Sequence, residues 1–260
     1  MRKSFTASIL AMALAASTIA MPLSANAAED QFTAAQKNEL HNIIREYLLE
    51  NPQILNEMIE KLQMAERQQQ EEQAKQVISS NADKIFRNPN DIVVGNPEGS
   101  VTLVEFFDYN CGYCKRSMAD VLRLTEEDKD VRGVMKEFTI LSEGSVIAAH
   151  AALAARNQNK YWELHLALMG AQGGVDSLEK VLEIAGKAGL DVDKLKADME
   201  ASRAEHDKII DETRNLAQEL GINGTPAFII DGTLVPGAVP YNQLAASVKG
   251  VRDSGGCKYC

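Results

Sequence analysis

Cys111 and Cys114 form a pair whose spacing and setting could do redox chemistry. They follow a short apolar run rich in β-forming residues at 103–107, and they precede a stretch at 118–124 whose apolar residues have helical spacing. This order places Cys111 at a helix N-terminus, where unpaired backbone N–H groups and the helix dipole stabilise a thiolate, the nucleophilic form of cysteine. We therefore expect the pair to cycle between dithiol and disulfide.

Zinc sites, haem attachment and structural disulfides also use cysteine pairs of this spacing. A zinc ribbon needs a second pair about 15 to 20 residues further on, and the next cysteines here are Cys257 and Cys260. Haem attachment needs a histidine after the second cysteine, where this chain has Lys115. The strand before and the helix after the pair favour a redox site over an inert staple. We predict no metal and no cofactor, and we expect the four histidines to be structural or surface residues.

Glu105 lies on the predicted strand, six residues before Cys111. Alternate residues of a strand share a face, so Glu105 points the same way as Leu103 and Phe107. One reading is a glutamate at the edge of a sheet that reaches solvent. The reading that we favour is a buried carboxylate with a raised pKa, which exchanges a proton with the thiol of Cys114.

The segment at 105–114, Glu-Phe-Phe-Asp-Tyr-Asn-Cys-Gly-Tyr-Cys, resembles the active-site segment of the DsbA-like branch of the thioredoxin superfamily. A second segment, at 221–232, resembles the cis-proline loop of that family, with Pro226 opening an apolar strand. The resemblance covers roughly residues 90–250. It implies an α/β protein with a thioredoxin fold and a helical insertion at about residues 144–220, preceded here by an N-terminal helical stalk.

The resemblance also implies roles for individual residues. Thr225 and cis-Pro226 would lie against the cysteine pair and bind the backbone of the substrate. Cys111 would form a mixed disulfide with the substrate, and Cys114 would resolve it.

Gly112 and Tyr113, between the two cysteines, bear on the direction of the reaction. They replace the Pro-His of the strongly oxidising DsbA, and without that histidine we expect the Cys111 thiolate to be stabilised less and the disulfide to be less oxidising. Cys-Gly-Tyr-Cys together with Thr225 resembles the isomerase DsbC. We therefore place a disulfide isomerase first, a dithiol oxidase second, and a non-catalytic envelope or copper-binding protein third.

The isomerase and oxidase readings together imply two kinds of partner. One is unfolded or misfolded secreted proteins, the substrates. The other is a membrane thiol-disulfide redox protein, either a DsbD-like reductant or a DsbB-like oxidant.

The N-terminus has the pattern of a secretory signal, with basic residues at 2–3, an apolar run at 7–23 and Ala-Asn-Ala at 25–27. We expect residues 1–27 to be removed and the protein to reach the periplasm, an oxidising compartment in which a cysteine pair can turn over. Loss of this segment takes the formal net charge from −10 to −12. That acidity argues against nucleic acid as a partner.

Residues 28–86 are predicted to form a helical oligomerisation stalk. Apolar stripes at 40–48 and 54–62 are followed by a polar, helix-forming stretch at 66–76. The stripes are too small to form a core alone, so we expect a second copy of the chain to cover them. The alternative is that these helices pack on the catalytic domain. A stalk of this kind is similar in role to those of the isomerases DsbC and ScsC.

The catalytic domain is expected at 87–252, followed by a flexible tail at 253–260 that ends in a second cysteine pair, Cys257 and Cys260. In order of preference, this pair is a local disulfide, a second redox pair, or a pair of ligands for a soft metal.

Overall fold

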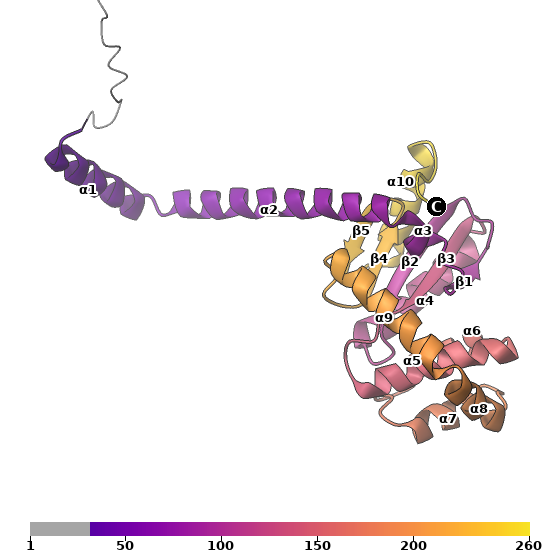
Figure 1. The fold of residues 1–260 in the computed structure, drawn as a ribbon. Coiled ribbons are helices and arrows are strands. Elements are labelled where there is room, and N and C mark those ends of the chain that lie inside the picture. Colours follow the sequence, from indigo (N-terminus) through magenta and orange to yellow (C-terminus); the bar gives the residue numbers. More distant parts are fainter. Residues whose placement is uncertain (1–31) are drawn as a thin grey trace, which may run out of the picture. The chain divides into compact units, whose positions relative to one another are not determined.

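The computed structural model describes residues 32–260, so the signal peptide expected at residues 1–27 lies outside the described part of the chain. The chain divides into two compact units, one up to Lys61 and one from Leu62 onward. Among the described residues, no helix is long and apolar enough to cross a membrane. The helices and strands, labelled in Figure 1, are α1 (Ala34–Glu50), α2 (Gln53–Ser80), α3 (Ala82–Phe86), β1 (Ile92–Gly95), β2 (Val101–Phe107), α4 (Gly112–Glu127), β3 (Val131–Glu137), α5 (Glu143–Ala155), α6 (Tyr161–Gly170), α7 (Leu178–Lys187), α8 (Val192–Ala201), α9 (Arg203–Glu219), β4 (Ala227–Ile230), β5 (Thr233–Pro236) and α10 (Tyr241–Asp253). A 3-10 turn, η1 (Arg156–Gln158), follows α5.

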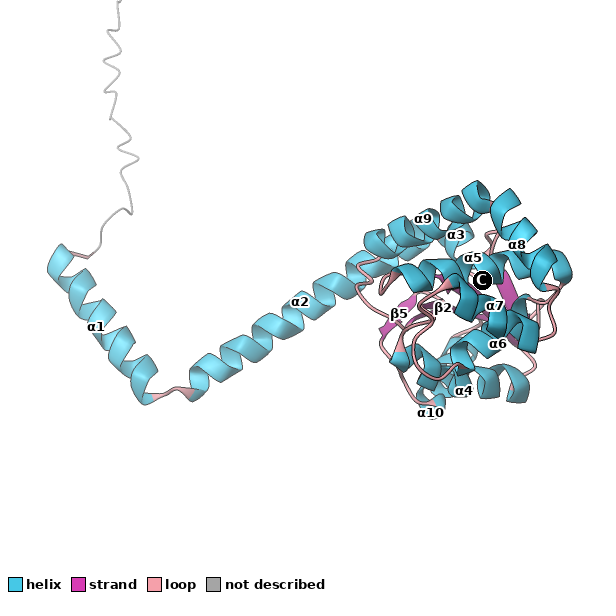
Figure 2. Cartoon of the chain, turned by 90° about the horizontal axis from the view of Figure 1, so that it is seen from below, coloured by secondary structure: helices cyan, strands magenta, loops and turns pink. Residues whose placement is uncertain are grey.

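The second unit is built on a five-stranded sheet with the strand order β1-β3-β2-β4-β5. Strands β2 and β3 run parallel, whereas the other neighbouring strands pair antiparallel. Every residue of β2 is buried, as expected for a central strand covered on both faces. The strands lie among helices in Figure 2, and this arrangement confirms the predicted α/β thioredoxin fold.

Side chains of β2 alternate between the two faces of the sheet, as the sequence predicts. Leu103 packs on the face that α4 and α10 cover. Val104 and Phe106 pack on the other face, against α3, α9 and the end of α2. Helix α10 begins at Tyr241, directly after its N-cap residue Pro240.

A block of helices, α5 to α9, connects β3 to β4 and forms the helical insertion expected in this fold. Ser142, Ser177 and Asp191 begin three of these helices, because each side chain accepts a hydrogen bond from a backbone N–H in the first turn. The insertion shares its core with Phe107 and Tyr109 at the end of β2. The insertion therefore reaches the segment that carries the cysteine pair.

The N-terminal helices leave their apolar stripes uncovered within the chain. Helix α1 begins at a capping box, in which the side chains of Thr33 and Gln36 each accept a hydrogen bond from the backbone N–H of the other. None of the residues of α1 is buried, and the first buried residue of α2 is Ala74. The exposed large apolar side chains of the two helices are Leu40, Ile43, Ile44, Tyr47, Leu48, Leu49, Leu55, Met58, Ile59, Leu62 and Met64.

The end of α2 and all of α3 belong to the second unit. Ile78, Ile85 and Phe86 are fully buried in the core on the α9 side of the sheet. We expected the stalk to run to residue 86, but the compact units divide after Lys61. The short apolar run that packs on the sheet directly follows a polar stretch, so the sequence alone assigns it to the polar stalk.

The C-terminal segment is held against the sheet, although the sequence predicts a flexible tail at 253–260. Cys257 and Cys260 form a disulfide with their Cα atoms 5.6 Å apart. The carboxylate of Asp231, in the turn between β4 and β5, accepts hydrogen bonds from the backbone N–H groups of the two residues between these cysteines, at 2.7 and 3.0 Å. Contacts between segments this far apart in the sequence produce no local sequence pattern, so the docking of this segment could not be predicted.

Candidate active site

Cys111 lies at the start of α4. Its backbone is extended, with φ −78° and ψ 113°, and its sulfur accepts a hydrogen bond from the N–H of Cys114 at 3.4 Å, so Cys111 is the N-cap of the helix. The thiol of Cys111 donates a hydrogen bond to the carbonyl of Thr225 at 3.1 Å. The predicted position of Cys111 is confirmed, and it is one at which the helix dipole stabilises negative charge.

Cys114 differs from Cys111 in burial. The side chain of Cys111 keeps 7% exposure, whereas that of Cys114 has 0%, and both thiols are free. Burial raises the pKa of the Cys114 thiol far above its ordinary value, and the neighbouring carboxylate of Glu105 raises this pKa further. Both cysteines are therefore buried, and Cys111 is the less buried of the two.

Glu105 is buried in the middle of the sheet, with 3% exposure, and does not reach solvent at an edge. Burial raises the pKa of its carboxyl from 4.5 to about 8. No described residue forms a hydrogen bond with its Oε1 atom. A carboxyl with a pKa close to 8 can hold or release a proton near neutral pH.

The loop before β4 lies against the cysteine pair. The peptide bond between Thr225 and Pro226 is cis, as the resemblance to DsbA-like proteins implies. Pro226 is buried, Thr225 is half-buried, and the carbonyl of Thr225 is the acceptor for the thiol of Cys111. Strand β4 pairs with β2, so the sheet itself brings this loop to the end of β2.

Asp108 fixes the loop between β2 and α4. This aspartate is fully buried, and its carboxylate accepts hydrogen bonds from the N–H groups of Ile140 and Leu141 and from the hydroxyl of Ser145. The same contacts explain why β3 ends at Glu137, although its sequence has β character up to residue 141. The N–H groups of residues 140 and 141 bind the carboxylate instead of a neighbouring strand.

Asn110, directly before Cys111, ties the same loop to the helical insertion. Its amide nitrogen donates to the hydroxyl of Ser142 and to the carbonyl of Val175, both at 2.9 Å. Its amide oxygen accepts a hydrogen bond from the N–H of Val175 at 2.6 Å. The placement of Cys111 therefore depends on two segments of the insertion as well as on the sheet.

A buried polar cluster lies behind this loop. The hydroxyls of Tyr109 and Tyr161 donate to Oε1 of Glu137 at 3.1 and 2.8 Å, and the Tyr109 oxygen is 3.2 Å from Nδ1 of His165. Burial raises the pKa of Glu137 to about 8 and lowers that of His165 to about 3. His165 is therefore a buried structural residue of this cluster, as expected.

Exposed apolar side chains accompany the motif. The side chain of Tyr113 is 61% exposed, and the guanidinium of Arg116 lies 4.2 Å from the centre of its ring. Ile140 and Leu141, which Asp108 holds beside the loop, are 39% and 53% exposed. Such a surface suits contact with apolar segments of a polypeptide.

Sequence reasoning missed Asp108, Asn110 and Glu137. The partners that tie them to distant segments lie 24 to 65 residues away along the chain, so spacing alone could not reveal them. A polar residue at the turn between strand and helix was the available signal for the first two. The structure does not bring the second cysteine pair to this site, and among residues 32–260 no cluster of three or more His, Cys, Asp or Glu could hold a metal.

Two protein families match the chain. The family described as DSBA-like thioredoxin domain matches residues 102–249, and the family described as Copper resistance protein ScsC N-terminal domain matches residues 36–74. The first match covers more than half of the chain and includes the cysteine pair and the cis-proline loop. The second spans most of α1 and much of α2.

Solved structures agree with these families. A thioredoxin-like oxidoreductase from Silicibacter pomeroyi is 51% identical, with a TM-score of 0.63 over 66% of this chain and 97% of that one. ScsC of Proteus mirabilis in a transitional conformation is 30% identical, with a TM-score of 0.59 over 84% of this chain and 98% of that one. The second likeness extends over the N-terminal helices as well as the sheet.

One curated relative is much longer than the segment that this chain matches. The Na(+)/H(+) antiporter NhaA 1 of Salinispora arenicola is 30% identical over 160 residues, which are 61% of this chain. The match spans 24% of the length of that relative, about a quarter.

Proposed function

This chain belongs to the family of DsbA-like thioredoxin domains, and from that membership we propose that it is a thiol-disulfide oxidoreductase that isomerises disulfides in secreted proteins. The observation that carries the proposal is the asymmetry of the cysteine pair. Cys111 keeps some exposure at a helix N-terminus beside Thr225, whereas Cys114 is buried beside Glu105. An attacking sulfur and a resolving sulfur need these two different settings.

The reaction begins with the thiolate of Cys111, which attacks one sulfur of a wrongly paired substrate disulfide. A mixed disulfide forms and a substrate thiolate leaves. That thiolate attacks another disulfide of the substrate, and a later substrate thiolate displaces Cys111, so substrate and enzyme end with no net change in oxidation. When the substrate cannot rearrange, the sulfur of Cys114 attacks the sulfur of Cys111 in the mixed disulfide. The substrate then leaves as a dithiol, and Cys111 and Cys114 are left as a disulfide.

Release through Cys114 needs a proton acceptor, because the thiol of Cys114 has a strongly raised pKa. Glu105 takes this role in the proposal, since with its own pKa of about 8 a fraction of its carboxyl is ionised near neutral pH and can accept the proton. Thr225 and Pro226 bind the substrate backbone beside Cys111, and Tyr113, Ile140 and Leu141 contact its apolar side chains.

Self-association forms the second part of the proposal. The apolar side chains of α1 and the first half of α2 are exposed, and a second copy of the chain offers the same stripes in return. Several catalytic units in one assembly would hold a misfolded substrate between several Cys111 thiolates and would limit access of an oxidising partner. Isomerisation requires that protection, because the attacking cysteine must stay reduced.

The periplasm is the proposed location, on the strength of the signal pattern at residues 1–27. There a membrane redox protein would keep the pair reduced, as a DsbD-like reductant does, or oxidise it, as a DsbB-like oxidant does. Which of these partners acts on the pair decides between isomerase and dithiol oxidase.

Reactivation of scrambled ribonuclease tests the proposal. The mature chain should restore ribonuclease activity in a glutathione buffer, and Cys111→Ala should abolish this activity. The matched control is Ser254→Ala, an exposed site outside both cysteine pairs. A mature chain that oxidises reduced ribonuclease but leaves the scrambled form unchanged would establish the dithiol oxidase instead, and full activity of Cys111→Ala would refute both.

A further inference from the structure

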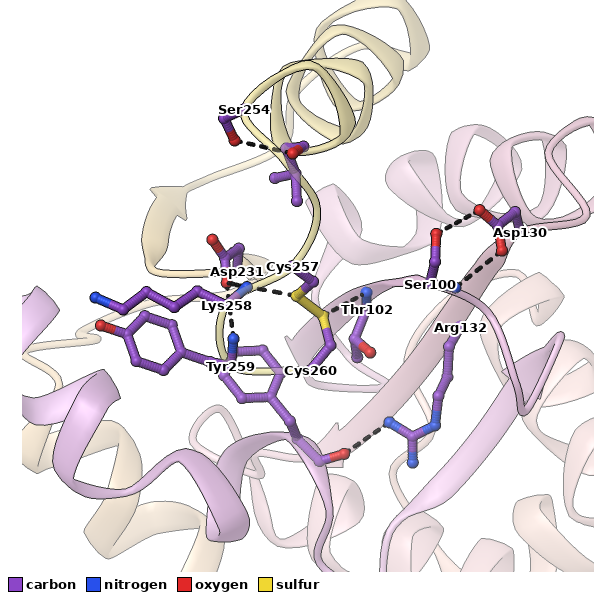
Figure 3. Close-up of a disulfide and its surroundings, with 12 residues drawn as sticks. Ser100, Thr102, Asp130, Arg132, Asp231, Ser254, Cys257, Lys258, Tyr259 and Cys260 are labelled. Atoms are coloured by element: carbon purple, nitrogen blue, oxygen red, sulfur yellow. Dashed lines mark hydrogen bonds between the residues drawn. A yellow bond between two sulfur atoms is a disulfide. The ribbon is translucent and has the colours of Figure 1, made fainter.

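The second cysteine pair lies at the base of the sheet, at the end of β2 away from the active site. Figure 3 shows the disulfide of Cys257 and Cys260 between the start of β2 and the turn that joins β4 to β5. The sulfur of Cys260 accepts a hydrogen bond from the backbone N–H of Thr102 at 3.0 Å. The sulfur of Cys257 lies 3.4 Å from Oδ1 of Asp231.

The fold fixes both of these neighbouring groups. Pairing between β2 and β4 ends at Leu103 and Ile230, so Thr102 extends one residue past the last antiparallel pair and its N–H can bind the sulfur. Asp231 follows Ile230 and has a positive φ of 51°, which starts the tight turn into β5. Its carboxylate lies beside the C-terminal segment that carries Cys257 and Cys260.

The two sulfurs consequently have opposite electrostatic surroundings. A hydrogen-bond donor faces Cys260, and a donor of this kind stabilises a thiolate. A carboxylate faces Cys257, and a like charge at this distance favours the neutral thiol, which can donate its proton to Asp231. When the disulfide opens, the negative charge should therefore reside on Cys260.

We propose that Cys257 and Cys260 form a second thiol-disulfide exchange site, in which an incoming protein thiolate attacks Cys257 and expels Cys260. The attack breaks the Cys257–Cys260 bond, forms a mixed disulfide on Cys257, and leaves a thiolate on Cys260 beside the N–H of Thr102. A second thiolate of the incoming protein then displaces Cys257, which takes up a proton. The incoming dithiol is oxidised to a disulfide, and its two electrons remain in the Cys257–Cys260 dithiol.

This polarity follows from the chemistry of exchange, because the sulfur with the more stable thiolate is the better leaving group. The disulfide is also poorly suited to act as a staple. It closes a loop of only four residues, and short loops gain least from cross-linking. Hydrogen bonds to Asp231 and the packing of Tyr259 against the core hold the segment in addition to the disulfide.

The site acts separately from the proposed chemistry of Cys111. Thr102 and Phe107 lie at opposite ends of β2, on the order of 17 Å apart at the usual rise per residue of a strand. Cys111 follows Phe107, so the docked tail does not reach the active-site pair of its own chain. The reductant of the tail is therefore a dithiol on another molecule.

The first test uses the full mature chain with Cys111→Ala and Cys114→Ala, so that a failure of the proposed isomerase cannot affect the result. Reduced and oxidised glutathione are mixed in a series of ratios, thiols are trapped with acid and alkylated, and the state of the tail is read by mass spectrometry. We expect the tail to pass from disulfide to dithiol within this series, with a glutathione adduct at Cys257. A tail that stays oxidised in a large excess of reduced glutathione is a staple, and an adduct at Cys260 reverses the assigned polarity. Either result overturns the proposal.

The second test compares single thiols in the same background. Cys260 in the Cys257→Ala variant should react with iodoacetamide faster, near neutral pH, than Cys257 in the Cys260→Ala variant. Adding Asp231→Asn to the Cys260→Ala variant removes the negative charge but keeps an oxygen that can accept from the N–H groups of Lys258 and Tyr259. This change should speed alkylation of Cys257 about tenfold, the equivalent of one pKa unit. Asp193→Asn, an exposed aspartate of α8, is the control and should have no effect. Equal rates for the two thiols, or no response to Asp231→Asn, would overturn the proposal.

Discussion

The two active-site thiols differ in burial and in the charge beside them, although they lie only three residues apart at the start of α4. Cys111 retains exposure, whereas Cys114 is fully buried with a strongly raised pKa. Iodoacetamide should therefore modify Cys111 at least about tenfold faster than Cys114 near neutral pH. Peptide mapping of the alkylated mature protein measures both rates. Similar rates at the two cysteines would contradict the assigned roles.

Burial of Glu105 gives the reduced protein a pH-dependent stability. Its pKa is about 8 in the folded chain and 4.5 as an ordinary value, so the contribution to stability is full below pH 4.5 and is lost as the pH rises through about 8. Glu105→Gln should remove this dependence, which is on the order of a few kcal/mol. Urea unfolding of the dithiol form at several pH values measures it.

Glu137 has the same direction of shift, so the Glu105→Gln variant should keep part of the slope. Glu98→Gln, at an exposed site in the loop before β2, is the control and should leave the slope unchanged. If Glu105→Gln and the parent chain lost stability equally over this pH range, the buried carboxyl would not be the group that titrates.

At the scale of elements, Asn110 couples the loop of the cysteine motif to the helical insertion. Asn110→Ala leaves both backbone groups of Val175 without their partner, and each buried unsatisfied group costs about 1–3 kcal/mol. We expect a loss of stability of that order together with a changed alkylation rate of Cys111. Denaturant unfolding and the alkylation assay measure the two effects. Asn242→Ala, at an exposed position of α10, is the control, and equal behaviour of the two variants would show that Asn110 holds nothing in place.

The sequence predicts elements with strong local patterns well. The alternation along β2 and the helix after Cys111 are both present in the structure. These features depend on neighbouring residues, whose spacing can be read directly.

Features that join distant segments were missed or placed wrongly. The N–H groups of Ile140 and Leu141 that bind Asp108 lie 32 and 33 residues away along the chain, and the partners of the C-terminal segment lie in β2 and in the β4–β5 turn. The apolar run at the end of α2 follows a polar stretch, so its burial against the sheet becomes visible only once the sheet has formed. Only the fold defines these contacts, because no periodicity marks them.

At the scale of the whole molecule, the exposed stripes of α1 and α2 predict a homo-oligomer. Ile44 and Leu55 are 47% and 60% exposed in the single chain, and replacing both with Glu would place charges in the interface. The mature chain should be oligomeric at micromolar concentration, and the double variant should be monomeric. Light scattering measures both masses. The control variant Gln68→Glu, in the polar stretch of α2, should stay oligomeric. A monomeric mature chain would rule out self-association through the stalk.

A stalk deletion should end at residue 61, not at residue 86. Ile78, Ile85 and Phe86 belong to the core of the second unit, and loss of one buried phenylalanine side chain costs about 3–5 kcal/mol. A fragment that starts at Leu62 keeps these residues and loses the exposed stripe of α1. Loss of isomerase activity in this fragment, with simple thiol exchange retained, would assign the stalk to isomerisation.

Trapping of the mixed disulfide tests most directly whether Cys111 is the attacking sulfur. In the full mature chain with Cys114→Ala, a disulfide with a substrate protein cannot be resolved within the motif and should accumulate. We expect mass spectrometry, after incubation with scrambled ribonuclease, to find ribonuclease peptides joined to Cys111. The variant with both Cys111→Ala and Cys114→Ala should trap no substrate at this site. Absence of a Cys111 adduct in the first variant would contradict the account.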